Sequence, residues 1–161
     1  MPGSAEIERI VTALDSQSPS GCAIALHIHF TTPEYLHQTY SKAWTAIYSE
    51  NGYVMQDPTV SWSFRNNGTI RWSDLAAQDT MKIYEKAGAY GISHGFACGV
   101  EHGGTRSVAG FARPDREFDD VEMQAIEALV LGLHAQTALP GTDPAATREL
   151  FRQLSARFGR P

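Results

Sequence analysis

The segment GFACGVEHGGTRSVAGFA, residues 95–112, constrains the fold more than any other part of this 161-residue chain. Two strand-like runs flank Gly103 and Gly104, and such a glycine pair is typical of a tight turn between antiparallel strands. The segment therefore predicts a β-hairpin. Because helical patterns lie near both ends of the chain, the hairpin places the protein in the α+β class.

Helices are predicted at the two ends. Residues 4–15 repeat apolar side chains at helical spacing behind Ser4, a possible N-cap. Around residue 119, Asp119 and Glu122 fit a capping box, and Phe118 with Met123 can form a hydrophobic staple. The helix that follows is expected to bury Met123, Ile126, Leu129, Val130 and Leu133.

The part of the chain between residues 22 and 94 predicts one strand and two helices. CAIALHIHF, residues 22–30, alternates between two faces, Ile24, Leu26, Ile28 and Phe30 against Ala25, His27 and His29. Thr32-Pro33-Glu34 is expected to open a helix that Asn51-Gly52 closes, and a further helix is expected from Ser73 to about Lys86. The predicted architecture is an α-β-α sandwich with a central antiparallel sheet flanked by helices.

Composition narrows the functional classes. Thirteen Lys and Arg against eighteen Asp and Glu give a net charge of −5, which argues against nucleic-acid binding by this chain alone. Two cysteines, Cys22 and Cys98, make no disulfide framework, so we expect free thiols in a reducing cytoplasm. No signal peptide or membrane-length apolar run is visible, so no membrane association is expected.

Aromatic residues mark a candidate site. Tyr40, Trp44 and Tyr48 recur every four residues, which places them on one face if all three lie in the expected helix. A buried stripe with satisfied polar atoms would explain these three residues alone. Asp57-Pro58 follows nine residues after Tyr48, however, and Trp72 follows fifteen residues after Asp57.

This spacing resembles the W-x3-Y-x8-D-P pattern and second Trp of the autoinducer-binding domain of LuxR-type quorum-sensing regulators. YEKAGAYGI, residues 84–92, is similar to another segment of that family, and Gly95 and Ser107 fit a later Gly and a sheet Ser. The resemblance covers about residues 5–135. The chain departs from the family in having Gly99 where a Pro is usual, and in a short segment between Gly95 and Ser107.

The resemblance implies an N-acyl-homoserine lactone as ligand, with no cofactor and no catalysis. An indole N–H only donates, so Trp44 suits the lactone carbonyl, whereas a carboxylate only accepts, so Asp57 suits the amide N–H. Tyr40 and Ser107 carry hydroxyls that can donate to the amide carbonyl. The remaining expected pocket residues are Tyr48, Thr59, Trp72, Ile83, Tyr84 and Ala87. Trp72 is also one of the polar positions that the resemblance implies.

The resemblance also predicts the organisation of the protein. Residues 1–138 are expected to form the ligand-sensing domain and residues 139–161 a linker or C-terminal tail without a helix-turn-helix domain. DNA contact would then need a helix-turn-helix domain outside this chain. The expected partner is a second copy or a full-length regulator, joined through the helix from Asp119 to Leu133 or the tail.

Several alternatives stay open from the residues alone. Asp57 before Pro58 is a common helix N-cap, Ser107 suits a sheet hydroxyl bonded to backbone, and Trp72 suits a core. His27 and His29 would share a strand face and, with His94 or His102, predict a metal site, so a metal-dependent hydrolase is the rival class. A LuxR-type sensor for a non-lactone small molecule is the third possibility.

Overall fold

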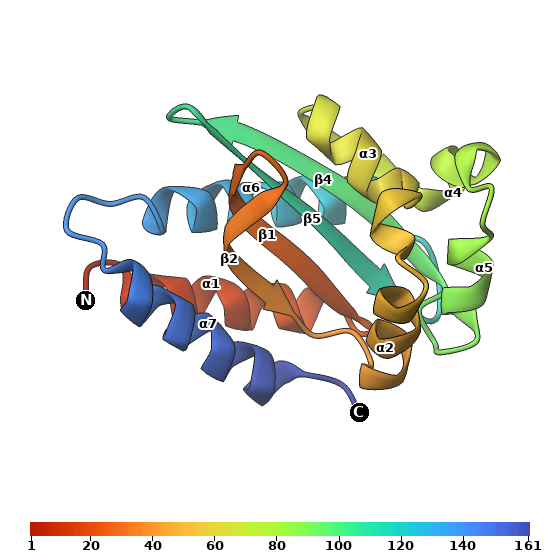
Figure 1. The fold of residues 1–161 in the computed structure, drawn as a ribbon, viewed down its shortest axis with the longest axis horizontal. Helices are drawn as coiled ribbons and strands as arrows, with labels where there is room; N and C mark the ends of the chain where they lie inside the picture. The colour runs from red at the N-terminus through yellow and green to blue at the C-terminus, as the bar shows by residue number, and fades with distance from the viewer.

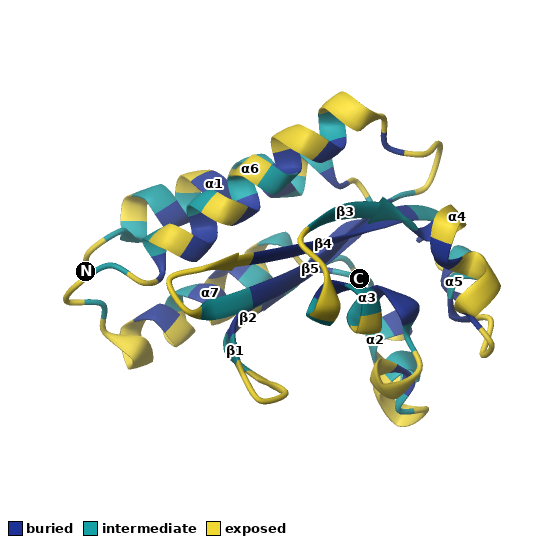
Figure 2. Ribbon diagram, turned by 90° about the horizontal axis from the view of Figure 1, so that it is seen from above, coloured by how far each residue is buried: buried dark blue, intermediate teal, exposed yellow.

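The computed structural model describes residues 1–161 as a sheet between two helical layers (Figure 1). Five strands form one antiparallel sheet in the order β2-β1-β5-β4-β3. Their bounds are β1 Gly21–His29, β2 Thr32–Gln38, β3 Gly68–Arg71, β4 His94–His102 and β5 Thr105–Arg113. Seen from above, α1 (Ser4–Gln17) and α6 (Asp120–Gln136) lie on one side of the sheet, and α2 to α5, within residues 42–88, lie on the other (Figure 2). The predicted α-β-α sandwich is confirmed.

The central hairpin forms as the sequence predicts. His102 pairs with Thr105 across the turn, and Gly103 and Gly104 adopt φ angles of 65° and 87°. These angles are accessible to glycine without steric cost.

The first helical layer consists of α1 (Ser4–Gln17), α6 (Asp120–Gln136) and α7 (Pro144–Phe158). The capping box of Asp119 and Glu122 is present at the start of α6, and both staple residues, Phe118 and Met123, are buried in the main core. Helix α7 buries Phe151 and Leu154 in that same core. None of the helices is both long and apolar enough to cross a bilayer.

The second layer consists of α2 (Lys42–Glu50), α3 (Pro58–Arg65), α4 (Trp72–Leu75) and α5 (Ile83–Gly88), with short 3-10 turns η1 (Tyr53–Met55) and η2 (Ala76–Gln78). The prediction of one helix from Thr32 to Asn51 is wrong in its first half. Residues 32–38 pair with β1 as an edge strand in which Tyr35 and His37 are buried and Leu36 between them is exposed. The helix begins only after Ser41, whose hydroxyl caps the Trp44 N–H, so Tyr40 precedes it.

The expected helix from Ser73 to Lys86 is also wrong, because the chain is interrupted between α4 and α5. Lys82 has a left-handed φ of 56°, and the Asp79 carboxylate caps the N–H groups of Ile83 and Tyr84 at 3.0 and 2.9 Å. A side chain that bonds these N–H groups starts a new helix in place of continuing the old one.

The alternation predicted for residues 22–30 holds only to Leu26. His27 has a φ of 55° and is buried on the same side as Ile24 and Leu26. Beyond it the faces are exchanged, so Ile28 turns to the other side of the sheet and Phe30 is fully exposed. The expectation that Ile24, Leu26, Ile28 and Phe30 share one face is therefore wrong.

Candidate ligand-binding site

A cavity of about 380 Å³ lies between the sheet and the helical layer formed by α2 to α5. Its walls are mostly apolar, and its volume falls in the range of small-molecule pockets. All but one of the residues predicted for the site line this cavity, namely Tyr40, Trp44, Tyr48, Asp57, Thr59, Trp72, Tyr84 and Ala87, together with the predicted wall residue Ile83. The exception is Ser107.

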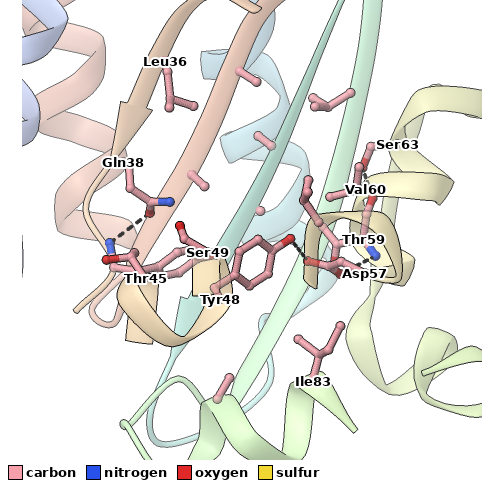
Figure 3. Close-up of a pocket in the computed structure, with 18 of the residues that line it drawn as sticks. Leu36, Gln38, Thr45, Tyr48, Ser49, Asp57, Thr59, Val60, Ser63 and Ile83 are labelled. Atoms are coloured by element: carbon pink, nitrogen blue, oxygen red, sulfur yellow. Dashed lines mark hydrogen bonds between the residues drawn. The ribbon is translucent and has the colours of Figure 1, made fainter. Parts of the chain in front are cut away.

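The carboxylate of Asp57 is the charged group of the cavity. Its Oδ2 accepts a hydrogen bond from the Tyr48 hydroxyl at 2.7 Å, and its Oδ1 accepts the Thr59 N–H at 2.9 Å (Figure 3). Burial raises the pKa of Asp57, while the bonds from Tyr48 and Thr59 act in the opposite direction. Asp57 is therefore the N-cap of α3 and a cavity-lining acceptor at the same time.

A second polar pair lies beside the carboxylate. The hydroxyls of Thr59 and Tyr84 are 2.8 Å apart, and the Tyr84 ring stacks on Trp72 at 4.9 Å between centroids with an interplanar angle of 10°. The indole of Trp72 also lies close to strand β4, because a Cβ on Gly95 would be only 2.6 Å from its ring atoms. Strand β4 and the Tyr84 ring thus fix the position of the Trp72 indole.

Two hydrogen-bond donors in the cavity wall have no partner. The hydroxyl of Tyr40 and the Nε1 of Trp72 are both buried, and neither makes a hydrogen bond. Burial raises the pKa of Tyr40 well above its usual value, so the hydroxyl stays protonated and can donate a hydrogen bond. Trp44, 4% exposed, carries a third donor in its indole N–H. Unpartnered buried donors are rare in proteins and need an explanation.

Ser107 lies on the opposite side of the sheet. Its hydroxyl accepts the His27 N–H at 3.0 Å and is 2.6 Å from Nδ1 of His134 on α6. Its strand neighbours Val108 and Gly110 line the cavity instead. The expectation that Ser107 faces the ligand is therefore corrected, and its hydroxyl bonds to backbone, as the sequence analysis allowed.

The two histidines of the rival hypothesis do not form a metal site. His27 is buried, with Nδ1 2.7 Å from the Thr105 hydroxyl and Nε2 2.8 Å from that of Thr137. His29 is exposed and pairs with Glu34 at 3.4 Å. No group of three His, Cys, Asp or Glu side chains is arranged to hold a metal ion. Both ring nitrogens of His27 thus have hydroxyl partners within the protein, so the histidine pair on which the hydrolase interpretation depended is not arranged to hold a metal ion.

Sequence reasoning missed the floor of the cavity. Strands β1 and β5 supply it with small side chains, and β2 supplies its outer rim; these residues are Ala23, Ala25, Leu36, Gln38, Val108 and Gly110. The strand alternation could have indicated Ala23 and Ala25, because they lie opposite the core residues Ile24 and Leu26.

The layered fold and the mostly apolar cavity define a small-molecule sensing domain. Residues 9–139 match the family model described as the autoinducer binding domain, and the chain belongs to that family. It is 31% identical over 100 residues to the transcriptional activator protein VanR of Vibrio anguillarum, a match that covers 60% of this chain but only 41% of that protein.

Solved structures share the fold. The N-acylhomoserine lactone-dependent LuxR family transcription factor CepR2 of Burkholderia cenocepacia aligns with a TM-score of 0.55 and 15% identity, over 84% of this chain and 93% of that chain. SdiA in complex with octanoyl-rac-glycerol aligns with a TM-score of 0.61 and 19% identity, over 83% of this chain and 58% of that chain. Escherichia coli SdiA in another structure gives a TM-score of 0.59 and 18% identity, over 83% and 61%.

Proposed function

We propose that the cavity binds an N-acyl-homoserine lactone-type autoinducer and that the chain is the sensory part of a quorum-sensing transcriptional regulator. The observation that carries this proposal is the pair of buried, unpartnered donors, Tyr40 and Trp72, in an apolar cavity beside the Asp57 carboxylate. A ligand with two or more carbonyl oxygens, one N–H and an apolar chain would satisfy this set of groups.

Each polar group then has a role on the ligand. The Tyr40 hydroxyl donates to the amide carbonyl, Trp44 Nε1 donates to the lactone carbonyl, and Asp57 accepts the amide N–H through a lone pair that Tyr48 and Thr59 leave free. Trp72, Tyr84, Ile83 and Ala87 enclose the ring, and the Trp72 N–H donates to a further oxygen of the ligand. Binding by such a cavity requires no cofactor and no catalytic step.

The wider organisation follows from family membership. We infer that residues 1–138 sense the ligand, that the chain pairs with a second copy or with a full-length regulator, and that DNA is contacted through a helix-turn-helix domain carried on a polypeptide outside these residues. The net charge of −5 supports the absence of tight operator binding by this chain alone.

Thermal unfolding with a panel of ligands tests the proposal. A ligand at 100 times its Kd adds about 2.7 kcal/mol to the free energy of unfolding, so the melting temperature should rise by several degrees with at least one acyl-homoserine lactone. The panel includes octanoyl glycerol as a non-lactone comparator. If octanoyl glycerol raises the melting temperature and no lactone does, the ligand is an acylated molecule other than a lactone. If no member of the panel raises it, the proposal is refuted.

A further inference from the structure

The cavity is closed at one end and open at the other. Ile83, Ala87 and Ile92 line the closed end and are 2%, 3% and 1% exposed. At the other end, Leu36 of β2 lines the same cavity but is 53% exposed. The close-up shows Leu36 on β2, well away from Asp57 and Ile83 (Figure 3). The cavity therefore reaches the surface at the β2 edge of the sheet.

A row of small residues connects the two ends. Gly110 of β5 pairs with Ala23 of β1, and Ala23 pairs in turn with Gln38 of β2. One step along, Ala25 of β1 pairs with Leu36. All of these residues line the cavity, so its floor consists of the small residues Gly110, Ala23 and Ala25 on β5 and β1, and Gln38 and Leu36 bound it on the outer strand.

The polar groups lie at the inner end of this floor. A Cβ on Gly110 would be 3.3 Å from the Tyr40 hydroxyl and 3.4 Å from the Thr59 methyl group, so the unpartnered donor lies directly over Gly110. A head group bonded to Tyr40 therefore starts where the row of small residues begins. From there, the path outward to Leu36 crosses Ala23 and Ala25, whose side chains are small.

We propose that the apolar tail of the ligand runs over Ala23 and Ala25 and emerges at the surface beside Leu36, so that the protein accepts long-chain acyl ligands without an upper length limit. This inference rests on the proposed function. Methylenes within the cavity are buried, and each should raise affinity about fourfold, which corresponds to about 0.8 kcal/mol. Methylenes beyond Leu36 stay outside the cavity and add little.

Isothermal titration of the full chain with acyl-homoserine lactones from butanoyl to tetradecanoyl tests the inference. Affinity should rise with chain length and then level off. A closed cavity would give a different curve, a maximum at one length followed by a fall of tenfold or more, because extra methylenes overpack a filled site. That fall would overturn this inference alone, whereas no binding by any length would overturn the proposed function as well.

Two variants test the path of the tail. Ala25→Leu raises the floor and should lower the affinity for dodecanoyl at least tenfold more than the affinity for butanoyl. Leu36→Ser, at an exposed position where folding is not at risk, should lower the affinity only for chains long enough to reach residue 36. The matched control is Leu131→Ser on the exposed side of α6, which should leave the whole series unchanged. Equal losses at all chain lengths in both cavity variants would overturn the path.

Discussion

The Tyr48 hydroxyl donates a 2.7 Å hydrogen bond to Oδ2 of Asp57, and the other oxygen of that carboxylate accepts the Thr59 N–H. The helix cap and the ligand acceptor, which are alternatives in the sequence, are compatible in this geometry. A carboxylate oxygen has two lone pairs, so each oxygen of Asp57 can accept one more bond from inside the cavity. The two roles can therefore be separated only by measuring stability and affinity on the same variants.

Asp57→Ala should lower both the free energy of unfolding and the affinity for the ligand. Loss of the cap costs about 1 kcal/mol of unfolding free energy, and an unpaired amide N–H in the cavity costs about 1–3 kcal/mol, roughly ten- to a hundredfold in affinity. Asp57→Asn keeps a carbonyl acceptor and should bind weakly. Asp143, which caps α7 away from the cavity, is the matched control: Asp143→Ala should lose stability and keep affinity. Preserved affinity in Asp57→Ala would leave Asp57 a cap alone. Denaturant unfolding and titration calorimetry supply the two measurements.

Tyr40→Phe should act differently on the free protein and on the complex: the free protein keeps or gains stability, whereas the complex becomes weaker. The Tyr40 hydroxyl is buried without a partner, so its removal should keep or raise the stability of the free protein, since an unsatisfied buried group costs about 1–3 kcal/mol. The complex loses a hydrogen bond, so affinity should fall about tenfold. Tyr35→Phe, on the other face of the sheet, should leave affinity unchanged. Unchanged affinity in Tyr40→Phe would exclude the hydroxyl from ligand binding.

Stability should fall as the pH is lowered from about 6.5 toward about 4. Burial and the neighbouring His134 ring, 4.2 Å away between centroids, lower the pKa of His27 to about 4, and burial lowers the pKa of His37 to about 4. A free histidine titrates near pH 6.5, so the unfolded chain takes up more protons in this interval and unfolding is favoured. Well above pH 6.5 both histidines are neutral in the folded and in the unfolded chain, and this loss of stability is absent.

Urea unfolding across that pH range, on two variants, checks the source of the effect. His27→Asn suits the positive φ at this position and should make the dependence on pH shallower, with His37 supplying the remainder. His29→Asn, the same substitution at an exposed position two residues away, is the matched control against which the His27→Asn profile is compared. Identical profiles for the wild type and His27→Asn would refute the assignment to His27.

The sequence pointed to most of the cavity wall even where it misplaced the backbone. Tyr40 reaches the cavity from the connection between β2 and α2, although its spacing from Trp44 suggested a shared helix. Pro33 and Glu34 are typical of a helix start, but pairing of residues 32–38 with β1 overrides that local preference. Sheet pairing between distant segments is not visible in a local pattern.

The position of Ser107 shows what the sequence could not predict. Ser107 and Gly110 are three residues apart on β5 and so face opposite sides of the sheet, but the pattern does not say which side holds the cavity. Gly99, the departure from the usual Pro, also has a structural reason. A Cβ there would be 2.2 Å from the Asn66 carbonyl oxygen, because the chain after α3 crosses β4 at that point.

Gly95→Ala should damage the ligand site through Trp72. The added Cβ would lie 2.6 Å from two indole carbons and 2.6 Å from the Phe111 carbonyl oxygen, and real contacts are not that short. Trp72 cannot simply retreat, because its ring stacks on Tyr84 and the Tyr84 hydroxyl is held 2.8 Å from that of Thr59. The strain should cost about 1–3 kcal/mol of stability, and the displaced indole should lower ligand affinity at least tenfold.

The matched control for this variant is Gly132→Ala on α6. A Cβ there would meet only Ile10 Cδ1, at 3.4 Å, so the change should keep affinity and raise stability by up to about 1 kcal/mol, because alanine is the better helix former. Thermal unfolding, titration calorimetry and tryptophan fluorescence on both variants compare the two positions. Wild-type affinity together with an unaltered fluorescence spectrum in Gly95→Ala would mean that β4 does not hold the indole in place, and that the position of Trp72 depends on its stacking with Tyr84 alone.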